Sequence, residues 1–134
     1  MREDLCVLVA EDDAMIGLAI HAVLASYGCS TLLASGVDHA LQVADPLDAV
    51  DLAIVDLKLA DGSGTGLIER LRALRPELPV VISTGYALGD ADRRALDIGD
   101  GRTVVLEKPW TEAELIAAID AAIEPRMPAA VARP

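Results

Sequence analysis

Apolar residues along the chain follow two different periods. Five short apolar runs have the length and continuity of strands buried on both faces, and the segments between them carry apolar residues at helical spacing. The predicted strands cover residues 5–10, 30–34, 52–55, 79–83 and 103–106. The predicted helices cover residues 14–26, 36–45, 67–74, 89–98 and 112–123. Five alternations of strand and helix are typical of a parallel sheet covered by helices on both faces, so we predict an α/β domain.

Length and local signals set the expected domain boundaries. A chain of 134 residues has the size of one domain. Thr111 and Glu114 have the spacing of a capping box at the start of the last predicted helix. We therefore expect residues 1–124 to form the domain and residues 125–134, which are rich in Pro and Ala, to form a loose C-terminal tail.

Composition argues against two classes of partner. The chain has 11 Lys and Arg against 22 Asp and Glu, a net charge of −11. Phosphate binding needs clustered basic residues, so we expect no nucleic-acid partner. The sequence contains no signal peptide and no apolar run of the length that a membrane span needs. We therefore expect a cytoplasmic protein that makes no membrane contact.

Reactive side chains follow four of the five predicted strands. Residues 11–13, Glu-Asp-Asp, come directly after the first strand, and Asp56 comes directly after the third. Thr84 follows the fourth strand, and Lys108 lies just beyond the fifth. Ligands of open parallel sheets bind outside the carboxyl ends of the strands, so we expect these side chains to share one edge.

These residue types together suit phosphoryl transfer to an aspartate. Asp12, Asp13 and Asp56 would repel one another at close range unless a cation joined them, and Mg²⁺ is the oxygen-loving ion that suits such a site. Lys108 and Thr84 add a positive charge and a hydroxyl donor for phosphoryl oxygens. Each feature alone has an ordinary explanation, such as an aspartate that caps a helix. Four of them at strand ends of one short chain favour a site.

The same residues resemble the receiver domain of two-component response regulators. The similarity covers residues 4–124 and includes the acidic residues 11–13, Asp56, the Asp-Gly-Ser-Gly loop at 61–64, Thr84-Gly85 and Lys108-Pro109. The resemblance implies a flavodoxin-like, doubly wound sheet of five parallel strands in the order 2-1-3-4-5, with five helices.

The resemblance also implies a role for each matching residue. Asp56 is similar to the phosphoacceptor, and Asp12 and Asp13 are similar to the carboxylates that hold Mg²⁺ together with Asp56. The backbone carbonyl of Lys58 would complete the metal ligands. Thr84 would bind the phosphoryl group and move on activation, and Lys108 would form an ion pair with it.

The chain departs from the family pattern in the fifth predicted strand and in the loop after the fourth. Val105 stands where the family usually has an aromatic side chain that rotates when the threonine moves. Residues 83–86, Ser-Thr-Gly-Tyr, partly resemble the "FATGUY" group of stand-alone receivers, which also lack that aromatic residue. We expect Gly85 to let the loop change conformation and Tyr86 to slow hydrolysis of the phosphoaspartate.

Three functions remain open at the level of the sequence. The leading prediction is a stand-alone response regulator that accepts a phosphoryl group from a histidine kinase or phosphotransfer protein and then contacts a downstream protein target. It would not be an enzyme beyond its own phosphorylation and slow dephosphorylation. A receiver excised from a hybrid kinase or a longer regulator is the second possibility. The third is a haloacid-dehalogenase-type phosphatase, but Lys58 occupies the position where that family needs a second aspartate.

Overall fold

The computed structural model describes residues 3–96, 98 and 101–124, and its main feature is a five-stranded parallel sheet with the order β2-β1-β3-β6-β7. Its strands are β1 (Cys6–Ala10), β2 (Ser30–Ala34), β3 (Leu52–Asp56), β6 (Val80–Thr84) and β7 (Thr103–Glu107). A short antiparallel hairpin pairs β4 (Lys58–Leu59) with β5 (Gly62–Ser63). Because β6 and β7 are the fourth and fifth strands of the main sheet along the chain, the predicted order 2-1-3-4-5 is confirmed.

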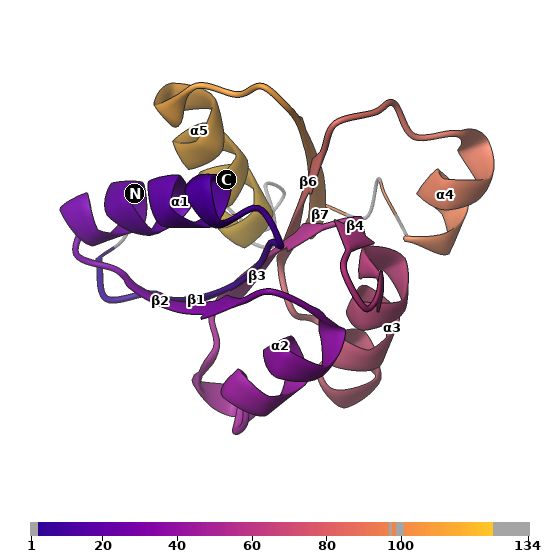
Figure 1. The fold of residues 1–134 in the computed structure, drawn as a ribbon, viewed down its shortest axis with the longest axis horizontal. Coiled ribbons are helices and arrows are strands. Elements are labelled where there is room, and N and C mark those ends of the chain that lie inside the picture. The colour runs from indigo at the N-terminus through magenta and orange to yellow at the C-terminus, as the bar shows by residue number, and fades with distance from the viewer. Residues whose placement is uncertain (1–2, 97, 99–100, 125–134) are drawn as a thin grey trace, which may run out of the picture.

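Five helices cover the sheet. They are α1 (Ala14–Ser26), α2 (Val37–Val43), α3 (Gly64–Leu74), α4 (Asp90–Ala95) and α5 (Glu112–Ile123), with a 3-10 turn at Leu47–Ala49. Helices α1 and α5 lie on one side of the sheet, and α2, α3 and α4 lie on the other (Figure 1). The predicted capping box is present, because the Thr111 hydroxyl accepts from the Glu114 amide while the Glu114 carboxylate accepts from the Thr111 amide. Two predicted helices are shorter than expected, mainly at their C-terminal ends: α2 ends at Val43 and α4 at Ala95, before the predicted ends at residues 45 and 98.

The two faces of the sheet bury separate apolar clusters. Val7 and Val9 of β1 point to the α1 and α5 side, while Leu8 and Ala10 point to the α2 and α3 side, as the period of two along a strand requires. Every residue of β3 and β6 is buried, which explains their continuous apolar sequence. The parallel strands therefore bring their carboxyl ends to one common edge.

Close packing fixes the position of the third strand at that edge. A Cβ atom on Gly64, the first residue of α3, would lie 2.2 Å from the Asp56 carbonyl oxygen and 2.7 Å from the Leu57 Cα. The Gly64 amide donates to the Leu57 carbonyl at 3.0 Å. Helix α3 can begin directly against the end of β3 only because residue 64 has no side chain.

The predicted tail at residues 125–134 lies outside the described residues, as do residues 97, 99 and 100 within and beyond the predicted fourth helix. None of the helices in the described part of the chain has the length and apolar character that a bilayer span requires.

Candidate functional site

Three carboxylates meet at the carboxyl edge of the sheet. Glu11 and Asp12 follow β1, and Asp56 is the last residue of the neighbouring strand β3. One carboxylate oxygen from each lies within 4.8 Å of the others. Glu11 and Asp56 are buried, with 5% and 7% exposure, whereas Asp12 is open to solvent. A partly open set of hard oxygen donors fits Mg²⁺, which keeps several waters when a protein binds it.

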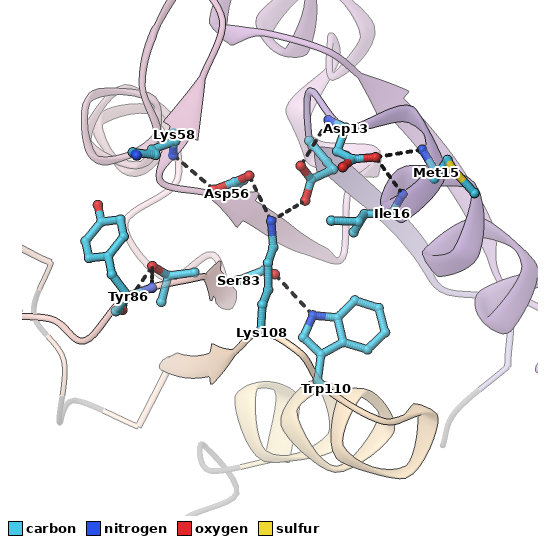
Figure 2. Close-up of polar contacts among 11 residues, drawn as sticks. Asp13, Met15, Ile16, Asp56, Lys58, Ser83, Tyr86, Lys108 and Trp110 are labelled. Atoms are coloured by element: carbon cyan, nitrogen blue, oxygen red, sulfur yellow. Dashed lines mark hydrogen bonds and ion pairs between the residues drawn. The ribbon is translucent and has the colours of Figure 1, made fainter.

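Lys108, which directly follows the edge strand β7, places its side chain in this cluster. The Lys108 ammonium lies 3.1 Å from Asp56 Oδ2 and 3.1 Å from Glu11 Oε1 (Figure 2). The Glu11 contact is an ion pair without good hydrogen-bond alignment, whereas Lys108 donates a hydrogen bond to Asp56. Burial alone would lower the pKa of Lys108, but its contacts with Asp56 and Glu11 outweigh burial and raise that pKa.

Glu11 carries the clearest sign of crowded negative charge. Burial, followed by the closeness of the Asp56 carboxylate, raises the pKa of Glu11 from 4.5 to about 7, against the opposing effects of the Asp13 amide and Lys108. Its Oε2 accepts from the Asp13 amide at 3.1 Å. The three acids face one ammonium group, so the cluster has spare negative charge with which to hold a divalent cation.

The structure places the Asp13 carboxylate at the start of α1 and outside the cluster of three acids, and its predicted role as a metal ligand stays a prediction. Asp13 Oδ1 accepts from the amides of Met15 at 2.9 Å and Ile16 at 3.3 Å and so caps the N-terminus of α1. Glu11, for which no role was predicted, lies in the cluster with Asp12 and Asp56. The sequence contained a signal for both outcomes, because Glu11 directly follows the strand and Asp13 directly precedes the helix.

The residues after Asp56 also touch its carboxylate. The Lys58 amide donates to Asp56 Oδ1 at 3.0 Å, so the two oxygens of Asp56 are held by different partners, an amide on one side and an ammonium on the other. The Lys58 side chain is exposed. The predicted role of the Lys58 carbonyl as a metal ligand stays a prediction.

Thr84 is fully buried, and its hydroxyl is occupied within its own turn. The Thr84 Oγ1 accepts from the Tyr86 amide at 3.2 Å and donates to the Tyr86 carbonyl at 3.1 Å. Tyr86 is 43% exposed, and a Cβ atom on Gly85 would meet no atom within 4 Å. To donate to a phosphoryl group on Asp56, the Thr84 hydroxyl must therefore give up the bond that it donates to the Tyr86 carbonyl.

Val105, which stands where the family usually has an aromatic residue, lines a surface hollow. Val105 of β7 is half-buried, and with Leu88, Arg93 and Glu107 it lines an open hollow of about 400 Å³ between α4, β7 and α5. Valine has no ring that could turn into or out of this space.

One long-range contact near the site was not predicted from the sequence. The Asp61 carboxylate, in the loop between β4 and β5, accepts from the amides of Val37 at 2.7 Å and Asp38 at 3.3 Å. These bonds cap α2 from another part of the chain and lower the pKa of Asp61. A Cβ atom on Gly36 would lie 2.5 Å from Asp61 Oδ1, so the contact requires glycine there. Helix α2 is thereby tied to the loop that follows Asp56.

The fold and this site together define a class of protein in which a buried aspartate at the edge of a parallel sheet faces a lysine and further acids. The chain matches the response regulator receiver domain over residues 7–120, and it belongs to that family. Phosphorylation and Mg²⁺ binding in two-component signalling are typical of the family.

Known relatives agree with this assignment. The chain is 34% identical to response regulator RppA of Synechocystis over 119 residues, which cover 86% of this chain and 49% of RppA. It is 32% identical to the phosphate regulon regulator PhoB of Escherichia coli over 128 residues, 93% of this chain and 54% of PhoB. A response regulator receiver domain protein from Clostridium thermocellum has a TM-score of 0.78 at 29% identity, covering 92% of this chain and 97% of that structure. The chain spans about half the length of RppA and PhoB, and 22% of the transcriptional regulator ZraR of Salmonella typhimurium.

Proposed function

We propose that this protein is a stand-alone phosphorylation switch in which Asp56 accepts a phosphoryl group from a histidine kinase or a phosphotransfer protein. The observation that carries the proposal is the double anchoring of the Asp56 carboxylate, with the Lys58 amide at 3.0 Å and the Lys108 ammonium at 3.1 Å. A carboxylate held in one orientation beside a cation is prepared to attack phosphorus.

In the proposed reaction, a lone pair on an Asp56 carboxylate oxygen forms a bond to phosphorus while the phosphorus–nitrogen bond of the donor phosphohistidine breaks. The bonding electrons stay on the donor imidazole, which holds a proton and leaves neutral. Mg²⁺ held by Glu11, Asp12 and Asp56 would neutralise charge on the phosphoryl oxygens. Lys108 stays near the reacting centre and pairs with a phosphoryl oxygen, while the Thr84 hydroxyl donates to another phosphoryl oxygen after giving up its bond to the Tyr86 carbonyl.

The protein is not an enzyme in this proposal beyond its own phosphorylation and slow dephosphorylation. Turnover of small phosphate esters by an aspartate nucleophile needs a second carboxylate as general acid, and Lys58 occupies the position two residues after Asp56. Tyr86, 43% exposed beside Thr84, would slow the attack of water on the phosphoaspartate.

The signal is then passed by protein contact in the cytoplasm. A net charge of −11 supports a protein target over nucleic acid. Relatives such as PhoB are transcriptional regulators of about twice this length, which makes a receiver within a longer regulator the second candidate. The length of the complete reading frame separates the two.

Intact mass after incubation with acetyl phosphate and Mg²⁺ tests the acceptor. We expect one added phosphoryl mass on the wild-type chain and none on Asp56→Asn. Asp51→Asn is a matched control, because Asp51 lies at the opposite end of β3 and bonds to the Cys6 amide. A stable phosphoryl group on Asp56→Asn at wild-type yield would refute the assignment.

A further inference from the structure

Trp110, the single tryptophan of the chain, is hydrogen-bonded to β6, the strand that ends in Thr84. The Trp110 indole nitrogen donates to Ser83 Oγ at 3.3 Å (Figure 2). Ser83 is 1% exposed and lies in register with Asp56 on one neighbouring strand and Leu106 on the other. The hydrogen bond therefore holds the indole beside β6, the strand that lies between β3, which ends in Asp56, and β7, which precedes Lys108.

The backbone and the charged end of Lys108 are held, but the length of side chain between them is flexible. The Lys108 amide donates to the Thr84 carbonyl at 2.8 Å, and the ammonium contacts Asp56 and Glu11. Four carbon atoms with free rotation join these two ends. Neighbouring groups must therefore decide whether the ammonium stays on Asp56.

A hollow beside Lys108 offers the ammonium another direction. Its volume is about 520 Å³, and both Lys108 and Trp110 line it. Asp13 lines the same hollow, and one of its oxygens caps α1 through the Met15 and Ile16 amides. A lysine that turned into this space would approach a carboxylate outside the acid cluster. The bond between Trp110 and Ser83 keeps the bulky indole as a wall of the hollow.

We propose that Trp110 is a positioning residue for phosphoryl transfer: held by Ser83, it keeps the Lys108 ammonium on Asp56 and away from Asp13. The inference rests on the proposed role of Asp56 as phosphoacceptor. Trp110 touches neither the donor nor the phosphoryl group in this proposal and acts through Lys108.

Two single variants of the full chain break the hydrogen bond from opposite ends. Trp110→Phe keeps a ring but removes the N–H donor, and Ser83→Ala keeps the indole but removes the acceptor. The rate of phosphoryl gain from acetyl phosphate with Mg²⁺, followed by intact mass, should fall about two- to tenfold in each, the range that one modest hydrogen bond can shift. The double variant should be no slower than the singles, because both remove the same bond.

A change of lysine position predicts two effects that a general loss of stability does not. The Mg²⁺-induced rise in melting temperature should be at least as large as in wild type, because the acids are untouched and the ammonium that competes with the metal has moved away. Adding Asp13→Asn should restore the rate of either variant, because it removes the competing charge while Asn still caps α1. Met15→Ala is the matched control: Met15 lines the hollow but has no part in the Trp110–Ser83 bond, so the rate should stay at the wild-type value.

NMR of the ¹⁵N-labelled Lys108 ammonium group reports whether this group is ordered, and the measurement needs no phosphoryl donor. We expect both variants to weaken the ordered ammonium signal that the wild type gives. An unchanged signal in both variants overturns the inference, whether or not Asp56 accepts a phosphoryl group. If the wild type gains no phosphoryl mass, the proposed function is overturned instead. If the wild type is phosphorylated and both variants gain the phosphoryl group at the same rate, only the role of Trp110 is overturned.

Discussion

Neighbouring aspartates give a direct test of which acids hold a cation. Asp12 lies in the cluster with Glu11 and Asp56, whereas Asp13 caps α1. We predict that Asp12→Asn weakens stabilisation by Mg²⁺ and that Asp13→Asn leaves it intact. The two substitutions are chemically identical and one residue apart, so each is the control for the other.

Mass action sets the size of the effect. A ligand at ten times its dissociation constant stabilises the folded state by about 1.4 kcal/mol. For a domain of this length the melting temperature should rise by about 4–7 °C. Asp12→Asn removes one of three carboxylates, so the response should shrink while the metal-free protein gains stability from reduced repulsion. Asn caps helices as well as Asp does, but Asp13→Ala should cost about 1 kcal/mol with no change in the Mg²⁺ response.

Thermal unfolding at Mg²⁺ concentrations from zero to tens of millimolar measures the stability of the metal-free protein and the Mg²⁺-induced rise in melting temperature. A monovalent salt keeps the ionic strength constant. The reasoning is refuted if Asp13→Asn flattens the Mg²⁺ response while Asp12→Asn retains it. A flat response of the wild type over the whole range would refute the metal site itself.

Three further predictions concern packing, capping and the switch. Gly64→Ala should destabilise the fold by about 2–3 kcal/mol because its Cβ would collide with the Asp56 backbone, whereas Gly66→Ala, with no atom within 4 Å, should stabilise α3 by up to about 1 kcal/mol in urea unfolding. The lowered pKa of Asp61 means that its contribution is present above the ordinary value of 3.8 and is lost as the pH falls through the lower folded-state pKa; Asp61→Asn should therefore flatten the acid limb of a stability–pH curve, and an unaltered limb would contradict the cap. Beryllofluoride with Mg²⁺ should change amide exchange over residues 84–96 and leave β7 nearly unchanged; changes centred on Val105 would contradict this.

The fold was predictable because each local pattern agreed with the global architecture. Continuous apolar runs matched strands buried on both faces, and Thr111 with Glu114 marked the start of α5. The strand order came from the family resemblance, since apolar periodicity alone does not specify which strands are neighbours. The C-terminal ends of α2 and α4 were less predictable, because the residues that end them, Ala44 and Leu96, give no glycine stop signal.

The site was predictable to the level of strand ends, and less so beyond them. Alternation along a strand tells which side chain faces which layer, but the rule ends where the strand ends. Glu11 and Asp13 lie in that region, which is why the sequence did not indicate that Glu11 would join the acid cluster while Asp13 would cap α1. The Asp61 contact with α2 and the Trp110 contact with Ser83 join residues more than twenty positions apart, and no local pattern encodes such pairs.

The same contacts suggest how a signal leaves a receiver without the usual aromatic residue. The Thr84 hydroxyl must release the Tyr86 carbonyl before it can donate to a phosphoryl group on Asp56, so phosphorylation loosens the turn that leads to α4. The start of α4 has no side-chain cap, whereas its end is held where Arg72 donates to the Leu96 carbonyl at 3.5 Å and to Thr103 Oγ1 at 2.7 Å. A helix fixed at one end and released at the other should move most at the released end. We therefore expect the exchange changes to decrease from Tyr86 toward Leu96.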